Sequence, residues 1–298
     1  MTHATRKRMT LISLNPMTKI LRVPTLNDTP ADFIQLFQLW QVIKASDSPA
    51  FVFDFSCCQF LRQNAVAFLG GLARLIEARG DRAIFDWSTL QGDSQRNLEQ
   101  NGFCAAFRAH KGGWQGNSVP YREDPQDNLD GIVEYLDKQW LGRDWVQADD
   151  DIKNQIVCTV LEIYSNAFEH GLSKIGVFSC GQRYPALNLL KLTAIDFGVG
   201  IPPNVRQFLQ HPTMLAEDSL RWAFQPGKTT RCNAMPGGTG LDMLRSFVKE
   251  KQGKIEIYSH DGYVLIDKNQ DLYRSAPTYF EGTLINITVQ CDPAYYTL

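Results

Sequence analysis

The chain has 298 residues, 44% of them hydrophobic and 21% charged, and its formal net charge is −2. This length and composition are typical of a globular protein of about two domains, and the small net charge gives no reason to expect a nucleic acid or an anionic membrane as partner. No apolar run reaches the ~18 residues of a membrane-spanning helix, and no apolar segment suited to a signal peptide follows the basic residues near the N-terminus.

The first 118 residues alternate between strand-like and helix-like segments. Their apolar and aromatic patterns predict strands at 20–24, 51–55 and 83–87, and helices at 29–46, 61–79 and 94–101. Thr29 and Pro30 suit the cap and the first position of the first helix. This alternation predicts a small α/β domain over residues 1–118, and the glycine-rich stretch 111–118 is the expected boundary to a second domain over residues 119–298.

The order of these elements resembles the STAS domains of anti-anti-sigma factors. In that family, a serine at the start of the helix that follows the strand is phosphorylated. Here Gln63 and Asn64 occupy the aligned positions and carry no hydroxyl, and Ser56 lies several residues too early. The resemblance therefore implies a regulatory domain that serves in docking or dimerisation. A phosphoacceptor role for Ser56, and a small α/β domain used only for packing, remain as alternatives.

The second half begins with two predicted helices, over residues 125–141 and 152–172. The second helix is apolar around most of its circumference, with one polar stripe made of Thr159, Glu162, Asn166, Glu169 and His170. This pattern predicts a helix that is buried on most sides and whose polar stripe faces a cavity. A carboxylate and an amide four residues apart lie on the same helix face and can hold a hydrated cation between them.

A predicted β-hairpin follows, with strands at 175–180 and 187–195. Asp196 closes the second strand, and Gly198 and Gly200 allow the backbone to turn tightly. Pro203 then suits the start of a short helix that reaches towards Leu209.

The series Glu162, Asn166, His170, followed by Asp196-x-Gly198-x-Gly200, resembles the GHKL superfamily of ATP-binding domains. Sensor histidine kinases, anti-sigma serine kinases, gyrase B and MutL belong to it. Later segments follow the family's order: a lid at 225–231, a second glycine box at 237–241 before a helix, and a closing Gly-Thr at 282–283. The resemblance spans roughly residues 125–290 and implies a GHKL (Bergerat) α/β sandwich with a mixed sheet.

The resemblance also implies roles for individual residues. Asp196 would select adenine, Asn166 would ligate Mg²⁺, and Glu162 would be the catalytic base or water-orienting group. Lys228 and Arg231 on the lid would neutralise the phosphates of ATP, whereas the role of His170 stays open. The remaining residues expected to contact the nucleotide are Gly198, Gly200, Thr229, Gly238, Thr239, Gly240, Leu241 and Thr283.

The Glu169-His170-Gly171 stretch after Asn166 and the small size of the domain most resemble the anti-sigma serine-kinase branch of the superfamily. We therefore expect a Mg²⁺-dependent ATP-binding and ATP-hydrolysing signalling protein whose lid closure controls a regulatory protein partner. The alternatives are a serine- or histidine-type protein kinase that acts on a separate partner, and a nucleotide-sensing module that does not hydrolyse ATP. A homodimer is possible. The seven cysteines form no CxxC pair, which favours reduced thiols in a cytoplasm, and the family resemblance implies a bacterial one.

Overall fold

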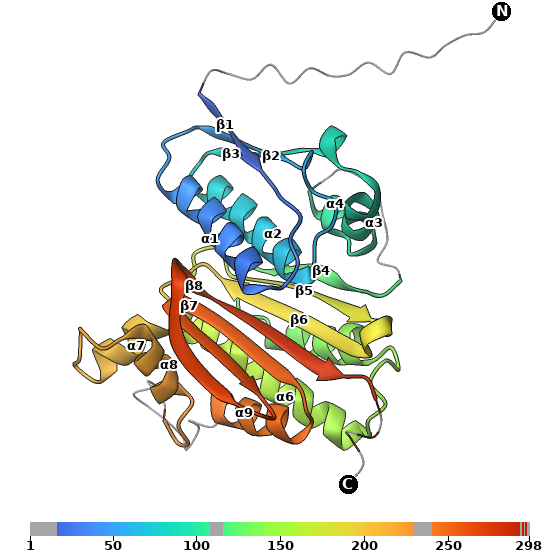
Figure 1. The fold of residues 1–298 in the computed structure, drawn as a ribbon, viewed down its shortest axis with the longest axis vertical. Helices are drawn as coiled ribbons and strands as arrows, with labels where there is room; N and C mark the ends of the chain where they lie inside the picture. Colours follow the sequence, from blue (N-terminus) through green and yellow to red (C-terminus); the bar gives the residue numbers. More distant parts are fainter. Residues whose placement is uncertain (1–16, 108–115, 229–239, 293, 295, 297–298) are drawn as a thin grey trace, which may run out of the picture.

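The computed structural model describes residues 17–107, 116–228 and 240–292, together with residues 294 and 296. Figure 1 shows that the chain stacks in layers: a small sheet, a pair of helices, a larger sheet and a second group of helices. No helix within the described ranges is both long enough and apolar enough to cross a membrane.

The small sheet is parallel and three-stranded, in the order β1-β2-β3. Its strands are Thr18–Arg22 (β1), Ala50–Asp54 (β2) and Arg82–Asp86 (β3). The helices between them are Pro30–Lys44 (α1) and Gln63–Ala78 (α2), and Gly92–Gln100 (α3) and Phe103–Ala106 (α4) follow β3. The predicted α/β alternation is therefore confirmed, with element ends displaced by one or two residues. Pro30 is the first residue of α1, where the backbone N–H of Thr29 donates to the Asp32 carboxylate at 3.0 Å.

The larger sheet has five strands in the order β4-β5-β6-β8-β7. The strands are Ser118–Asp124 (β4), Val177–Tyr184 (β5), Leu189–Asp196 (β6), Lys254–Asp267 (β7) and Asp271–Gln290 (β8). Every pairing in it is antiparallel, so the predicted mixed sheet is wrong. Short connections make β5 with β6, and β7 with β8, into hairpins, and such connections can join only antiparallel neighbours.

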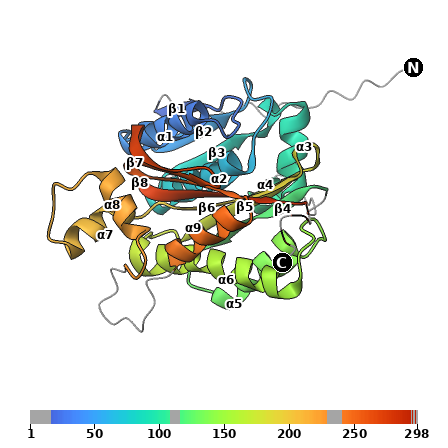
Figure 2. The same cartoon turned by 60° about the horizontal axis from the view of Figure 1, so that its bottom comes forward.

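One face of the five-stranded sheet is covered by helices from the second half of the chain (Figure 2). These are Leu129–Glu134 (α5), Asp150–Asn166 (α6) and Gly240–Glu250 (α9). α5 and α6 each continue into a π-helical turn, over Tyr135–Leu141 and Ala167–Gly171. The predicted helices at 125–141 and 152–172 are confirmed, although the first begins later, at Leu129. Ile201–Phe208 (α7) and Ala216–Ala223 (α8) project from one end of the sheet in Figures 1 and 2.

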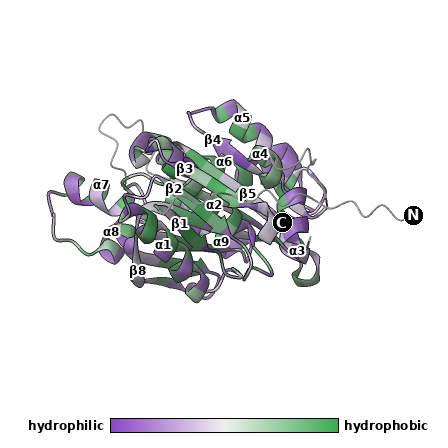
Figure 3. Ribbon diagram, turned by 90° about the horizontal axis from the view of Figure 1, so that it is seen from above, coloured by the Kyte–Doolittle hydropathy of each residue, from purple (hydrophilic) through white to green (hydrophobic). Residues whose placement is uncertain are grey.

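The opposite face of that sheet is covered by α1 and α2 (Figure 1). One hydrophobic core joins the two halves of the chain and includes Phe37 and Phe68 from the helices and Phe178 and Phe280 from the sheet. Figure 3 shows hydrophobic residues concentrated along β2 and α2, in the middle of the molecule. The first half of the chain is thus packed directly on the back of the second.

Candidate functional site

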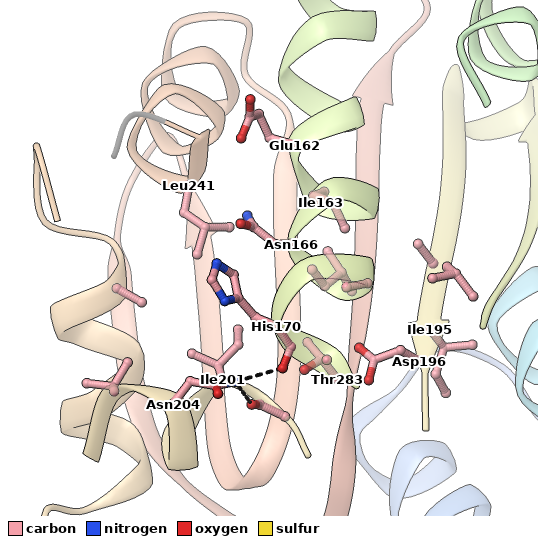
Figure 4. A pocket seen from close by; sticks show the side chains of 18 of the residues that line it. Glu162, Ile163, Asn166, His170, Ile195, Asp196, Ile201, Asn204, Leu241 and Thr283 are labelled. Carbon is pink, nitrogen blue, oxygen red and sulfur yellow. Dashed lines mark hydrogen bonds between the residues drawn. The ribbon is translucent and has the colours of Figure 1, made fainter. Parts of the chain in front are cut away.

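A pocket lies between α6, the end of β6, the interior of β8, and helices α7 to α9 (Figure 4). Its empty volume is about 960 Å³, including the part that opens to solvent. Most of its wall is apolar, with Ile163, Ile201, Val205, Leu241 and Ile285 among the lining residues. An apolar lining with a few polar side chains is typical of a site for a small organic ligand.

The polar stripe of α6 forms one side of the pocket. Figure 4 shows Glu162, Asn166 and His170 along the side of the helix that faces Leu241 and Ile201. Ile156, Val160 and Tyr164, on other sides of α6, are almost completely buried, which confirms the prediction of a buried helix with a polar stripe on a cavity. Two members of the stripe do not line the pocket: the buried Thr159 hydroxyl donates to the Gln155 carbonyl at 2.7 Å, and Glu169 is exposed to solvent.

Asp196 lies at the inner end of the pocket, where β6 ends, and is only 3% exposed. The backbone N–H of Gly198 donates to its carboxylate at 2.8 Å, and the N–H and hydroxyl of Thr283 also donate to it. Burial nevertheless dominates and raises the pKa of this carboxyl to about 7. The pocket thus contains a hydrogen-bond acceptor whose charge is poorly compensated by its surroundings.

The glycines after Asp196 allow the backbone to pass very close to its neighbours. A Cβ atom on Gly198 would lie 1.7 Å from the Gly171 carbonyl oxygen, at the end of the π-helical turn. Gly200 has φ +75°, and a Cβ there would lie 2.5 Å from the Glu281 carbonyl oxygen. A side chain at either position would push the loop away from α6 or β8. The two glycines therefore hold the end of α6 and Asp196 beside the same pocket.

The first turns of α7 close the lower side of the pocket. The Asn204 amide donates to the His170 carbonyl at 3.0 Å and to the Gly200 carbonyl at 2.9 Å, as drawn in Figure 4. It thereby ties the end of the α6 extension to the glycine loop. On the outer side, Lys228 lines the pocket, and its ammonium lies 5.9 Å from the centre of the Trp222 ring.

The structure brings most of the predicted site residues together. The predicted residues that line the pocket are Glu162, Asn166, Asp196, Gly200, Lys228, Leu241 and Thr283. Gly198 binds the Asp196 carboxylate through its N–H, and Gly240 is the first residue of α9. Thr229, Arg231, Gly238 and Thr239 lie outside the described residues.

Sequence reasoning missed Asn204 and Trp222 as lining residues and gave His170 no role. For Asn204 a signal was present, because it lies four residues after Gly200, one helical turn into the segment that Pro203 was expected to start. Trp222 lies just before the expected lid at 225–231, and its single large ring gave no indication of the direction it faces.

Within the described part of the chain, no three His, Cys, Asp or Glu side chains are grouped closely enough to hold a metal ion. On the α6 side of the pocket, the donors for a cation are the Asn166 amide and the Glu162 carboxylate, one helical turn apart. So small a donor set fits Mg²⁺ that arrives with a phosphate ligand, since Mg²⁺ usually keeps several waters and takes one or two protein ligands.

A scan against models of known protein families finds no match, and a search of curated proteins finds no similar sequence. The interpretation of the site therefore depends on the residues that line it and on their surroundings.

Proposed function

We propose that the protein binds ATP with Mg²⁺ in this pocket, hydrolyses it, and changes its contact with a protein partner as the segment around residues 213–236 closes over the nucleotide. The observation that carries this proposal is the convergence of three separate stretches on one pocket. These are the α6 stripe with Glu162 and Asn166, the β6 end with Asp196, and the α8–α9 region with Lys228 and Leu241.

The adenine ring fits the inner end of the pocket. Apolar walls accept its faces, and the exocyclic amino group donates to the Asp196 carboxylate. Guanine carries a carbonyl oxygen at the corresponding ring position, and two acceptors that face each other repel. The pocket should therefore prefer adenine to guanine, because leaving a buried acceptor unpaired carries a large free-energy penalty.

The phosphates fit the opposite end, near Lys228 and the two polar residues of α6. The Asn166 amide oxygen would ligate Mg²⁺, which neutralises phosphate charge when it is bound. Glu162, one turn earlier on the same helix, orients the water that attacks the terminal phosphate. Lys228 offsets negative charge on the phosphates.

The test is equilibrium binding of ATP and GTP, each with Mg²⁺, to the full chain and to Asp196→Ala. We expect the wild type to prefer ATP and the variant to lose binding. Asp86→Ala is the matched control, because Asp86 also ends a strand and accepts a turn N–H, from Ser88 at 3.2 Å, but lies in the small sheet. Unchanged ATP affinity in Asp196→Ala, or equal loss in both variants, would contradict the proposed site. Parallel counting of phosphate released to water against phosphate on added proteins separates hydrolysis from kinase activity.

A further inference from the structure

Phe197, the residue after Asp196, connects the pocket to the first half of the chain. The Asp196 side chain faces the pocket, whereas the Phe197 ring packs into the core on the other face of the sheet. The centre of this ring lies 5.4 Å from those of Phe68 and Phe280 and 6.1 Å from that of Phe178. Its contacts with Phe280 and Phe178 are edge-on, a favourable geometry for aromatic pairs. Two consecutive residues, Asp196 and Phe197, thus contact the pocket and α2, respectively.

The Phe197 ring can pack closely against α2 because the facing residue of that helix is a glycine. A Cβ atom on Gly71 would lie 2.1 Å from Cε2 of Phe197 and 2.8 Å from its Cζ. Gly71 is in the interior of a helix, where glycine is less favourable than alanine. Its absent side chain leaves the space that the Phe197 ring fills.

The backbone around Asp196 is held on its other sides as well. A Cβ on Gly282 would lie 2.1 Å from the Asp196 carbonyl oxygen, and the Val199 N–H donates to the Gly171 carbonyl at 2.7 Å. Residues of β8 and of the end of α6 therefore hold the backbone of residues 196–199 on the pocket side. The contact of Phe197 with α2 holds the same backbone on the opposite face of the sheet.

We propose that Phe197, packed against Gly71, is a positioning residue that holds Asp196 at the inner end of the pocket, so that α2 of the first half supports the nucleotide site from the other face of the sheet. The effect on nucleotide binding rests on the proposed function, whereas the effect on the loop itself does not. A closely packed support of this kind matters because a displacement of about 1 Å at a binding group can lower function a hundredfold.

The test compares two neighbouring glycines on α2. Gly71→Ala forces the Phe197 ring aside, while Gly70→Ala makes an equally close contact, 2.1 Å, with the hydroxyl of Tyr121 on β4. Both variants disturb the same layer, but only the first acts on the Asp196 loop. Phe197→Leu, which lacks the ring atoms that a Cβ at position 71 would meet, serves as a variant without overpacking. Combined with Gly71→Ala, it relieves the clash.

The first measurement is hydrogen exchange without nucleotide, in peptides that cover residues 196–200. We expect exchange about tenfold faster in Gly71→Ala and in Phe197→Leu, and little change in Gly70→Ala at the same fraction of folded protein. The second measurement is ATP affinity, which should fall about tenfold or more in the first two variants only, and adding Phe197→Leu to Gly71→Ala should not weaken it further.

Equal exchange at residues 196–200 in the Gly71→Ala and Gly70→Ala variants would overturn the positioning role, whatever the nucleotide result. If the exchange pattern is as expected but the wild type binds no adenine nucleotide, the positioning role stands and the proposed function fails. If ATP affinity changes equally in both glycine variants, α2 supports the whole sheet and does not act through Phe197.

Discussion

The buried Asp196 carboxyl should make the stability of the protein depend on pH in a way that one substitution removes. Its pKa is raised to about 7 in the folded protein by burial, against an ordinary value of 3.8. Because the folded-state pKa is the higher one, the stabilising contribution is fully present below about pH 4 and is lost as pH rises through about 7. Asp196→Asn keeps the shape and the acceptor oxygen but cannot ionise.

The size of the effect follows from the two pKa values. Over the range in which only the folded form holds the proton, stability falls by ~1.4 kcal/mol for each pH unit. Between pH 5 and pH 8, the loss from Asp196 amounts to about 2–3 kcal/mol, since ionisation of the folded form levels the curve above its pKa. The Asn variant should therefore gain about that much relative to the wild type over this interval.

The assay is urea unfolding of the wild type and Asp196→Asn at half-unit steps from pH 5 to pH 8. When the free energy of unfolding of one protein is subtracted from that of the other, the pH-dependent contributions of the other titrating groups cancel, provided that these groups are distant from the pocket. Parallel curves would mean that the carboxyl is ionised throughout this range in the folded state. Asp196 would then be hydrated, or paired with a cation, and could not form the dry inner end of an adenine site.

Further predictions concern the chemistry, the lid and the first half of the chain. Glu162→Ala should keep ATP affinity within a few-fold but lose most hydrolysis, and Asn166→Ala should lose both; hydrolysis at the wild-type rate in Glu162→Ala would make Glu162 structural. Adding a non-hydrolysable ATP analogue should slow hydrogen exchange within residues 213–236 outside α8, whereas α8, anchored by the buried Leu220, should stay protected in both states. Identical exchange with and without the analogue would show that this segment is not a switch. Phosphopeptide mass spectrometry after incubation with Mg²⁺ and ATP should find no phosphate on the first domain, and stoichiometric phosphate on Ser56 would identify the chain as its own kinase substrate.

The features that the sequence predicted well depend on short spacings along the chain. The α6 stripe follows from helical periodicity, so that Glu162 and Asn166 had to share one face. The turn after Asp196 follows from two glycines in positions that exclude any side chain. These local rules also placed the strands and helices of the first half to within one or two residues.

The features that it missed depend on contacts between distant segments. β4 was overlooked because Ser118–Asp124 adjoins the glycine-rich stretch, and its apolar residues gain their partners only beside β5. The mixed sheet was expected only from the family resemblance, since no local pattern shows which strand lies beside which, and the strand directions depend on that. Gly70 and Gly71 in the middle of a helix were a sign that α2 lies against another surface, since nothing local favours them there.

The contact between the two halves also bears on how the first half can act. Gln63 and Asn64, at the positions where the STAS family has its regulated serine, are 1% and 0% exposed. The Gln63 side chain accepts a hydrogen bond from the Tyr184 hydroxyl of β5 at 2.7 Å, so this end of α2 is docked on the five-stranded sheet. Beside it, Lys191 of β6 forms an ion pair with Asp28. A modifying enzyme cannot reach such a position without separating the layers, and separation would expose the shared aromatic core. A structural change in the first half should therefore act on the pocket through the packing of α2 on the five-stranded sheet. Within this packing, Phe197 is the residue directly next to Asp196 in the chain.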